Sequence, residues 1–355
     1  MKPKPRDCIT QIPAFPLGAM SDIPKGAMLL NTNESRFGPS PKVYQALTRD
    51  PATLGLNDYP AAEAHTLNRA LADHFDFGPE QIVSVGGGEL LLPLAMSVFA
   101  EPGSEVIYFA DGFQKFHNYT LMCDARPIRV AREGDPVSAV LGALSPRTRI
   151  VLIDNPGNPT GRLLGPDAIA QIHAGLPLDV LLILDEAYIE FSGFGDGGLD
   201  MARRHANVLT TRTFSKAYGL AGLRIGWGAG DADLIGAIKR VIPSFPIPRP
   251  SLIGALAALS DGDHVARVAD EVRRIRIEAT ERLTRAGWEV APSAANFLLI
   301  RPGEHPGGAI ANTVQALHAA NILVRFLPTF AGAPAIRMTL GTAEDMAQVY
   351  TVMGI

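Results

Sequence analysis

Between residues 81 and 241, short apolar runs alternate with segments of helical spacing, and this pattern predicts an α/β domain. Strands that are apolar on both faces are typical of a mostly parallel sheet covered by helices on both sides. Runs of this kind lie at 82–85, 106–109, 149–153, 180–184 and 207–211, with a further strand expected at 223–228. Segments of helical spacing lie at 89–100, 113–122, 167–176 and 231–241. We therefore expect a large domain of three layers, α/β/α.

The pattern changes on both sides of this region. Residues 242–250 hold four prolines in nine positions and break all periodicity. Beyond them, helices at 263–286, 310–320 and 343–353 and strands at 296–300, 323–326 and 336–340 predict a smaller α+β unit. The first 35 residues are rich in Pro and Gly, with a short strand expected at 29–34, and a helix is expected at 61–76. We expect an N-terminal arm over 1–35 that associates with the small domain, a large domain over 36–245 and a small domain over 246–355.

Composition narrows the class of protein. With 355 residues and 47% hydrophobic content, the chain can bury a large core. Its net charge of −4 offers no electrostatic footprint for nucleic acid or an anionic membrane. The two cysteines, Cys8 and Cys123, make neither a disulfide framework nor a metal-binding pair, so no metal site is expected. No apolar run approaches the ~20 residues of a membrane helix. The basic N-terminus leads into no sustained apolar region, and a cytoplasmic protein is expected.

Polar clusters follow three of the predicted strands. They lie at residues 86–89, 154–161 and 185–188. Ligands of open parallel sheets bind at the carboxyl ends of the strands, so these clusters lie where a site is expected.

A fourth cluster surrounds Lys216. Most lysines lie on the surface, and that is the plain interpretation of this one. The alternative is an amine in a lined pocket, where desolvation and a nearby cation lower its pKa enough for Schiff-base formation. Hydroxyls at Thr213 and Ser215 and the guanidinium of Arg224 favour the alternative, because a phosphate beside the amine requires such donors. A phosphate and an imine on one small molecule indicate pyridoxal 5'-phosphate.

Each of the other candidate residues has a structural and a functional interpretation. Glycines before Glu89 commonly link a strand to a helix, but they also make a phosphate cradle at a helix N-terminus. Asp185 caps a helix or, after so apolar a strand, meets a cation such as a protonated pyridine nitrogen. Asn158 and Tyr188 are a turn residue and a core aromatic, or together they hydrogen-bond a phenolate oxygen. Phe113 belongs to the core or stacks on a flat ring.

The order and spacing of these motifs resemble the fold-type I pyridoxal-phosphate-dependent aminotransferases. The motifs are 155–161 (NPGNPTG), 185–188 (DEAY) and 213–216 (TFSK) followed by 222–224 (GLR). More narrowly, the chain resembles the histidinol-phosphate aminotransferases. That likeness rests on 30–34 (LNTNE), 38–41 (GPSP), 185–191 (DEAYIEF) and 336–342 (IRMTLGT).

The resemblance implies a role for each matching residue. Lys216 is the Schiff-base lysine, Asp185 partners the pyridinium nitrogen, Asn158 and Tyr188 contact the ring oxygen, and Phe113 stacks on the ring. The remaining implied contacts to the cofactor phosphate are Gly87, Gly88, Glu89, Thr213, Ser215, Arg224 and, from the second subunit of a homodimer, Tyr59. On the substrate side the resemblance implies Asn33 and Arg337, with Arg325 as a second cation nearby.

Three positions depart from the family pattern. Glu89 stands where the phosphate loop usually has Asp, Phe113 replaces the usual stacking Tyr, and Phe15 lies where relatives often place a Tyr near the substrate. These changes leave the expected cofactor in place and put the substrate side chain in question.

The implied activity is transfer of an amino group from a donor, most narrowly histidinol phosphate, to a 2-oxo acid such as 2-oxoglutarate. Asp185 keeps the ring nitrogen protonated, so that the ring accepts electrons, and Lys216 carries the proton from Cα. An aromatic or other amino-acid aminotransferase and a threonine-phosphate-type decarboxylase remain alternatives. A ligand-sensing regulator on this fold normally has a fused DNA-binding domain, and the 35 residues before the first motif leave no room for one. On the substrate side, the alternative is that Arg325 forms a structural ion pair and Arg337 alone binds a carboxylate.

Overall fold

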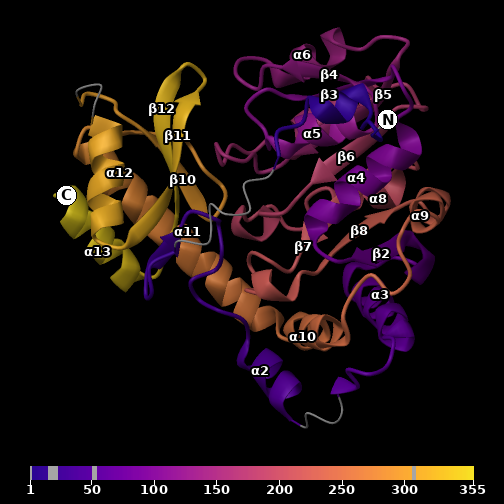
Figure 1. Ribbon diagram of the computed structural model, residues 1–355, viewed down its shortest axis with the longest axis horizontal. Helices are drawn as coiled ribbons and strands as arrows, with labels where there is room; N and C mark the ends of the chain where they lie inside the picture. Colours follow the sequence, from indigo (N-terminus) through magenta and orange to yellow (C-terminus); the bar gives the residue numbers. More distant parts are fainter. Residues whose placement is uncertain (1, 15–22, 50–53, 306–308) are drawn as a thin grey trace.

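A seven-stranded sheet forms the centre of the larger part of the molecule (Figure 1). The structure, a computed structural model, describes residues 2–14, 23–49, 54–305 and 309–355. The strand order is β2-β8-β7-β6-β5-β3-β4; strands β3 to β7 are parallel and β8 is antiparallel to both of its neighbours. The strands are β2 (Ile82–Val85), β3 (Glu105–Phe109), β4 (Arg126–Val130), β5 (Thr148–Asp154), β6 (Leu181–Asp185), β7 (Val208–Thr213) and β8 (Gly226–Gly230).

Helices cover both faces of this sheet, as the side chains of β5 show. Ile150 and Leu152 pack in one core cluster with residues of α4 and α9, whereas Val151 and Ile153 pack in another with residues of α6 and α7. This alternation has the period of two that a strand buried on both faces requires. The helices are α3 (Ala61–Phe75), α4 (Gly88–Phe99), α5 (Lys115–Met122), α6 (Pro136–Gly142), α7 (Pro166–Ala174), α8 (Leu199–Arg204) and α9 (Ala232–Lys239), with 3-10 turns η3 (Pro79–Gln81), η4 (Ile189–Phe191) and η5 (Ala221–Leu223). The expected three-layer α/β fold is confirmed.

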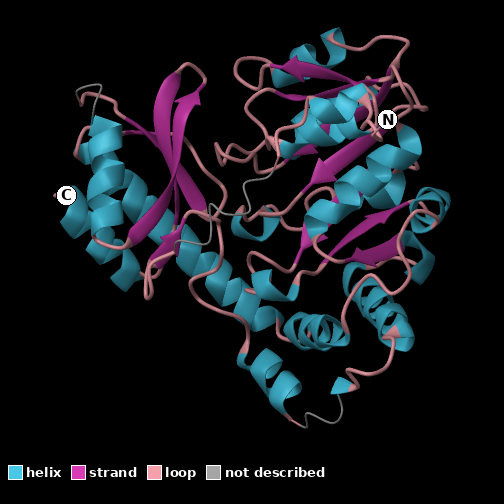
Figure 2. Cartoon of the chain, viewed as in Figure 1, coloured by secondary structure: helices cyan, strands magenta, loops and turns pink. Residues whose placement is uncertain are grey.

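A five-stranded sheet, ordered β1-β11-β12-β10-β9, forms the smaller part (Figure 2). Its strands are β1 (Met28–Leu30), β9 (Glu289–Val290), β10 (Phe297–Arg301), β11 (Ile322–Phe330) and β12 (Ala333–Thr339). The helices packed with it are α11 (Gly262–Arg285), α12 (Ala309–Ala319) and α13 (Ala343–Met353). Helix α11 buries Val268, Val272, Ile275, Ala279 and Leu283, which share one face at helical spacing.

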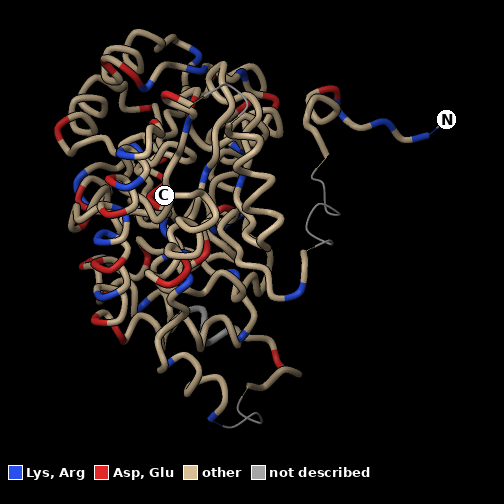
Figure 3. Tube along the Cα trace, turned by 90° about the vertical axis from the view of Figure 1, so that its left-hand side faces the viewer, with Lys and Arg blue, Asp and Glu red and all other residues tan. Residues whose placement is uncertain are grey.

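The N-terminal segment contacts both parts of the chain. Strand β1 pairs in parallel with β11 and so completes the edge of the smaller sheet. Before it, α1 (Asp7–Thr10) lies beside α5, and Arg6 donates a hydrogen bond to the carbonyl of Met122 over 2.8 Å. Figure 3 shows this first segment to one side of the molecule, with charges of both signs interspersed over the rest of the trace.

The proline-rich segment does not coincide with a change of packing. Helix α10 (Arg249–Leu259) follows it and contacts α3 and α2 (Pro41–Thr48), and its Leu252 and Ala255 share a core cluster with Leu67 and Trp227. The packing of the larger part thus continues through α10, and the division at residue 246 stays an expectation. No helix of the described residues is long and apolar enough to cross a membrane.

Candidate functional site

The site lies at the carboxyl ends of the parallel strands, where Asp154 ends β5 and Asp185 ends β6. These two residues are direct partners in the β5–β6 register. Strand β7 ends beside them at Thr213, and the chain then turns through Ser215 to Lys216. The sheet topology therefore gathers the polar clusters of separate segments at one edge, as the general rule for such sheets requires.

Lys216 is partly buried, and its amine donates a hydrogen bond to the backbone carbonyl of Thr32 over 3.0 Å. The amine lies 5.7 Å from the centre of the Tyr188 ring. Burial lowers the pKa of Lys216 to about 8, and the Arg337 guanidinium adds to the effect. A lysine in this state offers a substantial neutral fraction near pH 8, which is what attack on an aldehyde requires.

The carboxyl group of Asp185 accepts only long hydrogen bonds from the described residues around it. Its Oδ1 accepts a hydrogen bond from the backbone N–H of Ala187 over 3.3 Å and one from the Thr211 hydroxyl over 3.4 Å. Burial, with a smaller contribution from the Asp154 carboxylate, raises the pKa of Asp185 to about 7. A cation at this point would restore the charged form, and a protonated ring nitrogen is such a cation.

A cradle for an anion forms where α4 begins. Gly87 has φ 105°, and a Cβ built there would lie 2.7 Å from Nη2 of Arg224. A Cβ at Gly88 would lie 3.1 Å from that of Thr213. Across the cradle, Arg224 donates to the Ser215 hydroxyl over 3.3 Å. The N-terminus of a helix, two hydroxyls and a guanidinium fit a phosphate group.

A hydrogen-bonded chain connects the predicted ring-oxygen and substrate residues. Tyr188 is 7% exposed, and its hydroxyl accepts from the side-chain amides of Asn33 over 3.0 Å and Asn158 over 3.4 Å. Arg337 donates to Oδ1 of Asn158 over 2.7 Å and to the carbonyl of Asn31 over 2.6 Å. Its Nε is buried without a hydrogen-bond partner among the described residues, which leaves a donor for a ligand.

Phe113 and Glu89 are each fixed by a residue to which the sequence analysis gives no role of its own. The N–H of Phe113 donates to Oδ2 of Asp154 over 3.0 Å, and its ring meets that of Phe116 edge to face. The carboxylate of Glu89 accepts a hydrogen bond from the Tyr119 hydroxyl. Asp154 was visible as a polar residue at a strand end, whereas Tyr119 lies in a helix pattern that gives no such signal.

Two further predicted residues are exposed in the isolated chain. Tyr59 is 76% exposed and stacks on Phe245 with ring centres 4.4 Å apart. Arg325 is exposed and lies directly opposite Arg337 in the β11–β12 register. Within the described part of the chain it has no ion-pair partner, so the alternative of a structural ion pair at Arg325 finds no support there. Phe15 falls outside the described residues.

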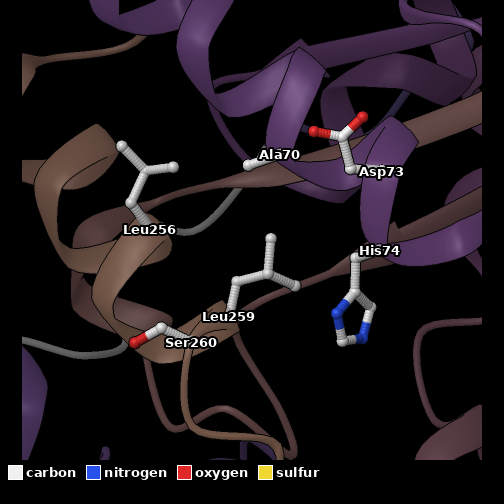
Figure 4. Close-up of a pocket in the computed structure, with 6 residues that line it drawn as sticks. All are labelled: Ala70, Asp73, His74, Leu256, Leu259 and Ser260. Carbon is white, nitrogen blue, oxygen red and sulfur yellow. The ribbon is translucent and has the colours of Figure 1, made fainter.

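Elsewhere on the surface, a shallow hollow lies between α3 and α10 (Figure 4). Its lining residues are Ala70, Asp73, His74, Leu256, Leu259 and Ser260, and none of them belongs to the site at the strand ends. Among the described residues, no group of three or more His, Cys, Asp or Glu side chains is arranged to hold a metal ion.

Comparison with known proteins agrees with this geometry. A family model described as aminotransferase class I and II matches residues 25–352. Histidinol-phosphate aminotransferase of Erythrobacter litoralis is 38% identical over 98% of this chain and 96% of its own length. The protein of that name from Sphingopyxis alaskensis is 36% identical over 91% of this chain and 89% of its own length. The crystal structure of histidinol-phosphate aminotransferase from Sinorhizobium meliloti, in complex with pyridoxal-5'-phosphate, has a TM-score of 0.89 and 26% identity, covering 100% of this chain and 98% of that chain. The chain belongs to the class I and II aminotransferases.

Proposed function

We propose that this protein uses pyridoxal 5'-phosphate to transfer the amino group of histidinol phosphate to a 2-oxo acid such as 2-oxoglutarate. The observation that carries the proposal is the Lys216 amine, partly buried and of lowered pKa, at the same end of the sheet as the Asp185 carboxyl group and a phosphate cradle. The two relatives described as histidinol-phosphate aminotransferases support this choice of reaction.

The residues present fit the cofactor. Its phosphate would take the cradle of Gly87, Gly88, Thr213, Ser215 and Arg224, where any side chain larger than glycine at residue 87 would meet the guanidinium. Asp185 would pair with the ring nitrogen, Tyr188 and Asn158 would hydrogen-bond the ring oxygen, and Phe113 would stack on the ring of the cofactor. Its aldehyde would meet Lys216.

Bound pyridoxal phosphate supplies a carbon that takes up the amino group and a ring that accepts the electron pair left at Cα. The protein supplies proton control. Asp185, ionised by its cationic partner, holds the proton on the ring nitrogen. Lys216, once its amine is free, would take the proton from Cα and return it to the cofactor carbon. Tyr188, with two amide donors on its hydroxyl, orients the ring oxygen.

Two guanidiniums support a dianionic substrate. Arg325 and Arg337 are opposite each other on neighbouring strands, an arrangement that costs free energy unless an anion lies between them. The phosphate of histidinol phosphate carries about two negative charges at pH 7 and three oxygens that suit Arg forks. An ordinary amino acid offers a single carboxylate to the same place.

A homodimer with a shared site is part of the proposal. Tyr59 and Phe245 form an exposed aromatic pair, and Leu56 nearby in the chain is 76% exposed. Exposed apolar groups of this size favour a protein contact, and the proposal has Tyr59 reach the partner's phosphate. A cytoplasmic location likewise stays a prediction.

The test is the ratio of kcat/KM for histidinol phosphate and phenylalanine, with 2-oxoglutarate as acceptor. We expect the wild type to prefer histidinol phosphate, and Arg325→Ala to lower this preference by about tenfold or more, since a charge-assisted contact contributes ~1.5–3 kcal/mol. Arg285→Ala, which removes an exposed arginine of α11 paired with Glu281, is the control and should leave the ratio unchanged.

Two results would change the assignment. A preference for phenylalanine, or an equal loss for both substrates in Arg325→Ala, would make the protein a general amino-acid aminotransferase. Release of carbon dioxide from an amino-acid phosphate, with no 2-oxo acid consumed, would make it a decarboxylase.

A further inference from the structure

A single buried carboxylate, that of Asp154, holds two loops of the site. Asp154 is 3% exposed, and its Oδ2 accepts hydrogen bonds from the N–H of Phe113 over 3.0 Å and the N–H of Asn158 over 2.8 Å. Phe113 follows β3 and Asn158 follows β5, so one oxygen joins the loop of the predicted stacking residue to the loop of the predicted ring-oxygen contact.

The other oxygen of Asp154 is held by Arg132, whose side chain is 1% exposed. Nη2 of Arg132 donates to Oδ1 of Asp154, Nη1 donates to the Asp154 carbonyl over 3.1 Å, and Nε donates to Asp111 over 3.1 Å. The guanidinium also lies 4.3 Å from the centre of the Phe109 ring. Arg132 thus connects the end of β5, at Asp154, to the loop that carries Phe113, through Asp111 of that loop.

Two glycines make room for this ion pair. A Cβ at Gly112 would lie 2.9 Å from Oδ1 of Asp154, and a Cβ at Gly157 would lie 2.9 Å from Cζ of Arg132. Gly112 directly precedes Phe113, and Gly157 directly precedes Asn158. Both loops therefore pack against the pair by their backbones, at the residue next to the predicted contact.

We propose that the buried Arg132–Asp154 ion pair is a positioning element of the active site, which fixes Phe113 and Asn158 against the bound cofactor and touches neither substrate nor reacting atoms. This inference rests on the proposed function and adds a role for two residues outside the cofactor motif. The cost of desolvating both charges offsets most of the attraction within a buried ion pair, so the pair contributes little net stability. Its larger effect is to fix the positions of the two loops. Preorganised contacts of this kind depend on a supporting layer of hydrogen bonds.

Asp154→Asn is the informative variant because it keeps the side-chain volume and disrupts the hydrogen-bond pattern around that side chain. An amide has one acceptor oxygen and one donor group. If the oxygen faces the two N–H groups, the amide NH₂ faces Nη2 of Arg132; if the amide is turned, its NH₂ faces Phe113 and Asn158. Either way a donor meets a donor: the first orientation breaks the contact to Arg132, and the second breaks the contacts to both loops. Arg132→Lys is the second variant, since an ammonium cannot span Asp111, the Asp154 carboxylate and the Asp154 carbonyl at once.

Glu105→Gln is the matched control. Glu105 is 4% exposed and pairs with Arg147 over 2.7 Å. It begins β3 and so lies at the end of the parallel strands opposite to the site. Like Asp154 it is a buried carboxylate paired with an arginine, although Arg147 is largely exposed, and it contacts neither loop.

The experiment measures the Kd of the cofactor-free protein for pyridoxal phosphate, the visible circular dichroism per bound cofactor, and the unfolding midpoint. In Asp154→Asn we expect Kd to rise by about tenfold or more and the dichroism to fall, because a loosened site binds and orients the ring less well. Arg132→Lys should show the same two changes. Glu105→Gln should lower the unfolding midpoint alone.

The outcomes separate this inference from the function on which it rests. A wild-type protein without affinity for pyridoxal phosphate would overturn the proposed function. A wild type that binds and turns over, with Asp154→Asn equal to Glu105→Gln in Kd and dichroism, would overturn only the positioning role. If Asp154→Asn does not fold, the same comparison with Arg132→Lys decides.

Discussion

Arg337 donates a hydrogen bond to the side chain of Asn158 over 2.7 Å, and this contact joins the smaller sheet to the larger one at the site. The same guanidinium donates to the carbonyl of Asn31 in the N-terminal segment over 2.6 Å. One side chain therefore connects three segments that are distant in sequence. An anion bound by Arg337 would contact the same guanidinium that orients Asn158 and, through Asn158, Tyr188.

Arg337→Lys should lower kcat/KM for the amino donor by about 100-fold, since the loss of one partner in a buried charged contact costs ~2–5 kcal/mol. The lysine keeps the charge but cannot donate to Asn158 and an anion in one plane. Cofactor affinity should change far less. Steady-state kinetics beside a pyridoxal phosphate titration checks both, and an unchanged kcat/KM would remove Arg337 from the substrate site.

Asp185→Asn keeps the shape of the side chain and removes the charge that, in the proposed function, holds the proton on the ring nitrogen. Turnover should fall by several powers of ten, at ~1.4 kcal/mol of transition-state stabilisation for each factor of ten. Far-UV circular dichroism should show the fold intact. Near-normal turnover in this variant would show that another group partners the ring.

Much of the fold was predictable because its strands are buried on both faces. The runs that became β2, β3, β5 and β6 are largely apolar, and the observed bounds differ from the expected ones by one residue at most at either end. Strand β4 was missed because it is a half-exposed edge strand that reads Arg-Pro-Ile-Arg-Val. The strand expected from residue 223 begins instead at Gly226, because Leu223 ends a 3-10 turn and Arg224 adopts a left-handed conformation with φ 47°.

The candidate site likewise contains residues that were predictable from the sequence and residues that were not. Lys216, Asp185 and the glycines were predictable because their spacing follows strand ends, although their roles stay predictions. Arg132 was not, because nothing local to residue 132 signals a partner 22 residues later in the chain. A buried ion pair is a property of tertiary packing, and the sequence around each member reads as an ordinary polar loop.

The pH dependence of cofactor capture tests the surroundings of Lys216. Its pKa in the folded protein is lowered to about 8, so the neutral amine becomes the major form as pH rises through that value. The rate at which cofactor-free protein captures pyridoxal phosphate should therefore rise through about pH 8 and then level off, whereas an ordinary lysine with pKa ≈ 10.4 would still be gaining neutral amine. Between those two values the unfolded chain binds more protons, so this group adds stability as pH rises. A capture rate that still climbs at pH 10 would contradict the lowered pKa.

Mixing two inactive variants tests the shared site. Tyr59 is exposed in the isolated chain, and we expect it to act in the partner subunit. Tyr59→Ala and Lys216→Ala, each inactive alone, should regain activity when unfolded together and refolded, because a mixed dimer contains one site with neither defect. The expected gain is a fraction of wild-type activity, measured with the homodimers refolded separately as controls. Full activity of a strict monomer would rule out a shared site.

The central claim is that Lys216 is the amine that carries the cofactor, and covalent trapping tests it most directly. Purified protein loaded with pyridoxal phosphate is reduced with borohydride, digested and mapped by mass spectrometry. We expect the added mass on the peptide that contains Lys216, with no label at that peptide in Lys216→Ala. A label distributed over other lysines, or a protein that takes up no pyridoxal phosphate, would contradict the account.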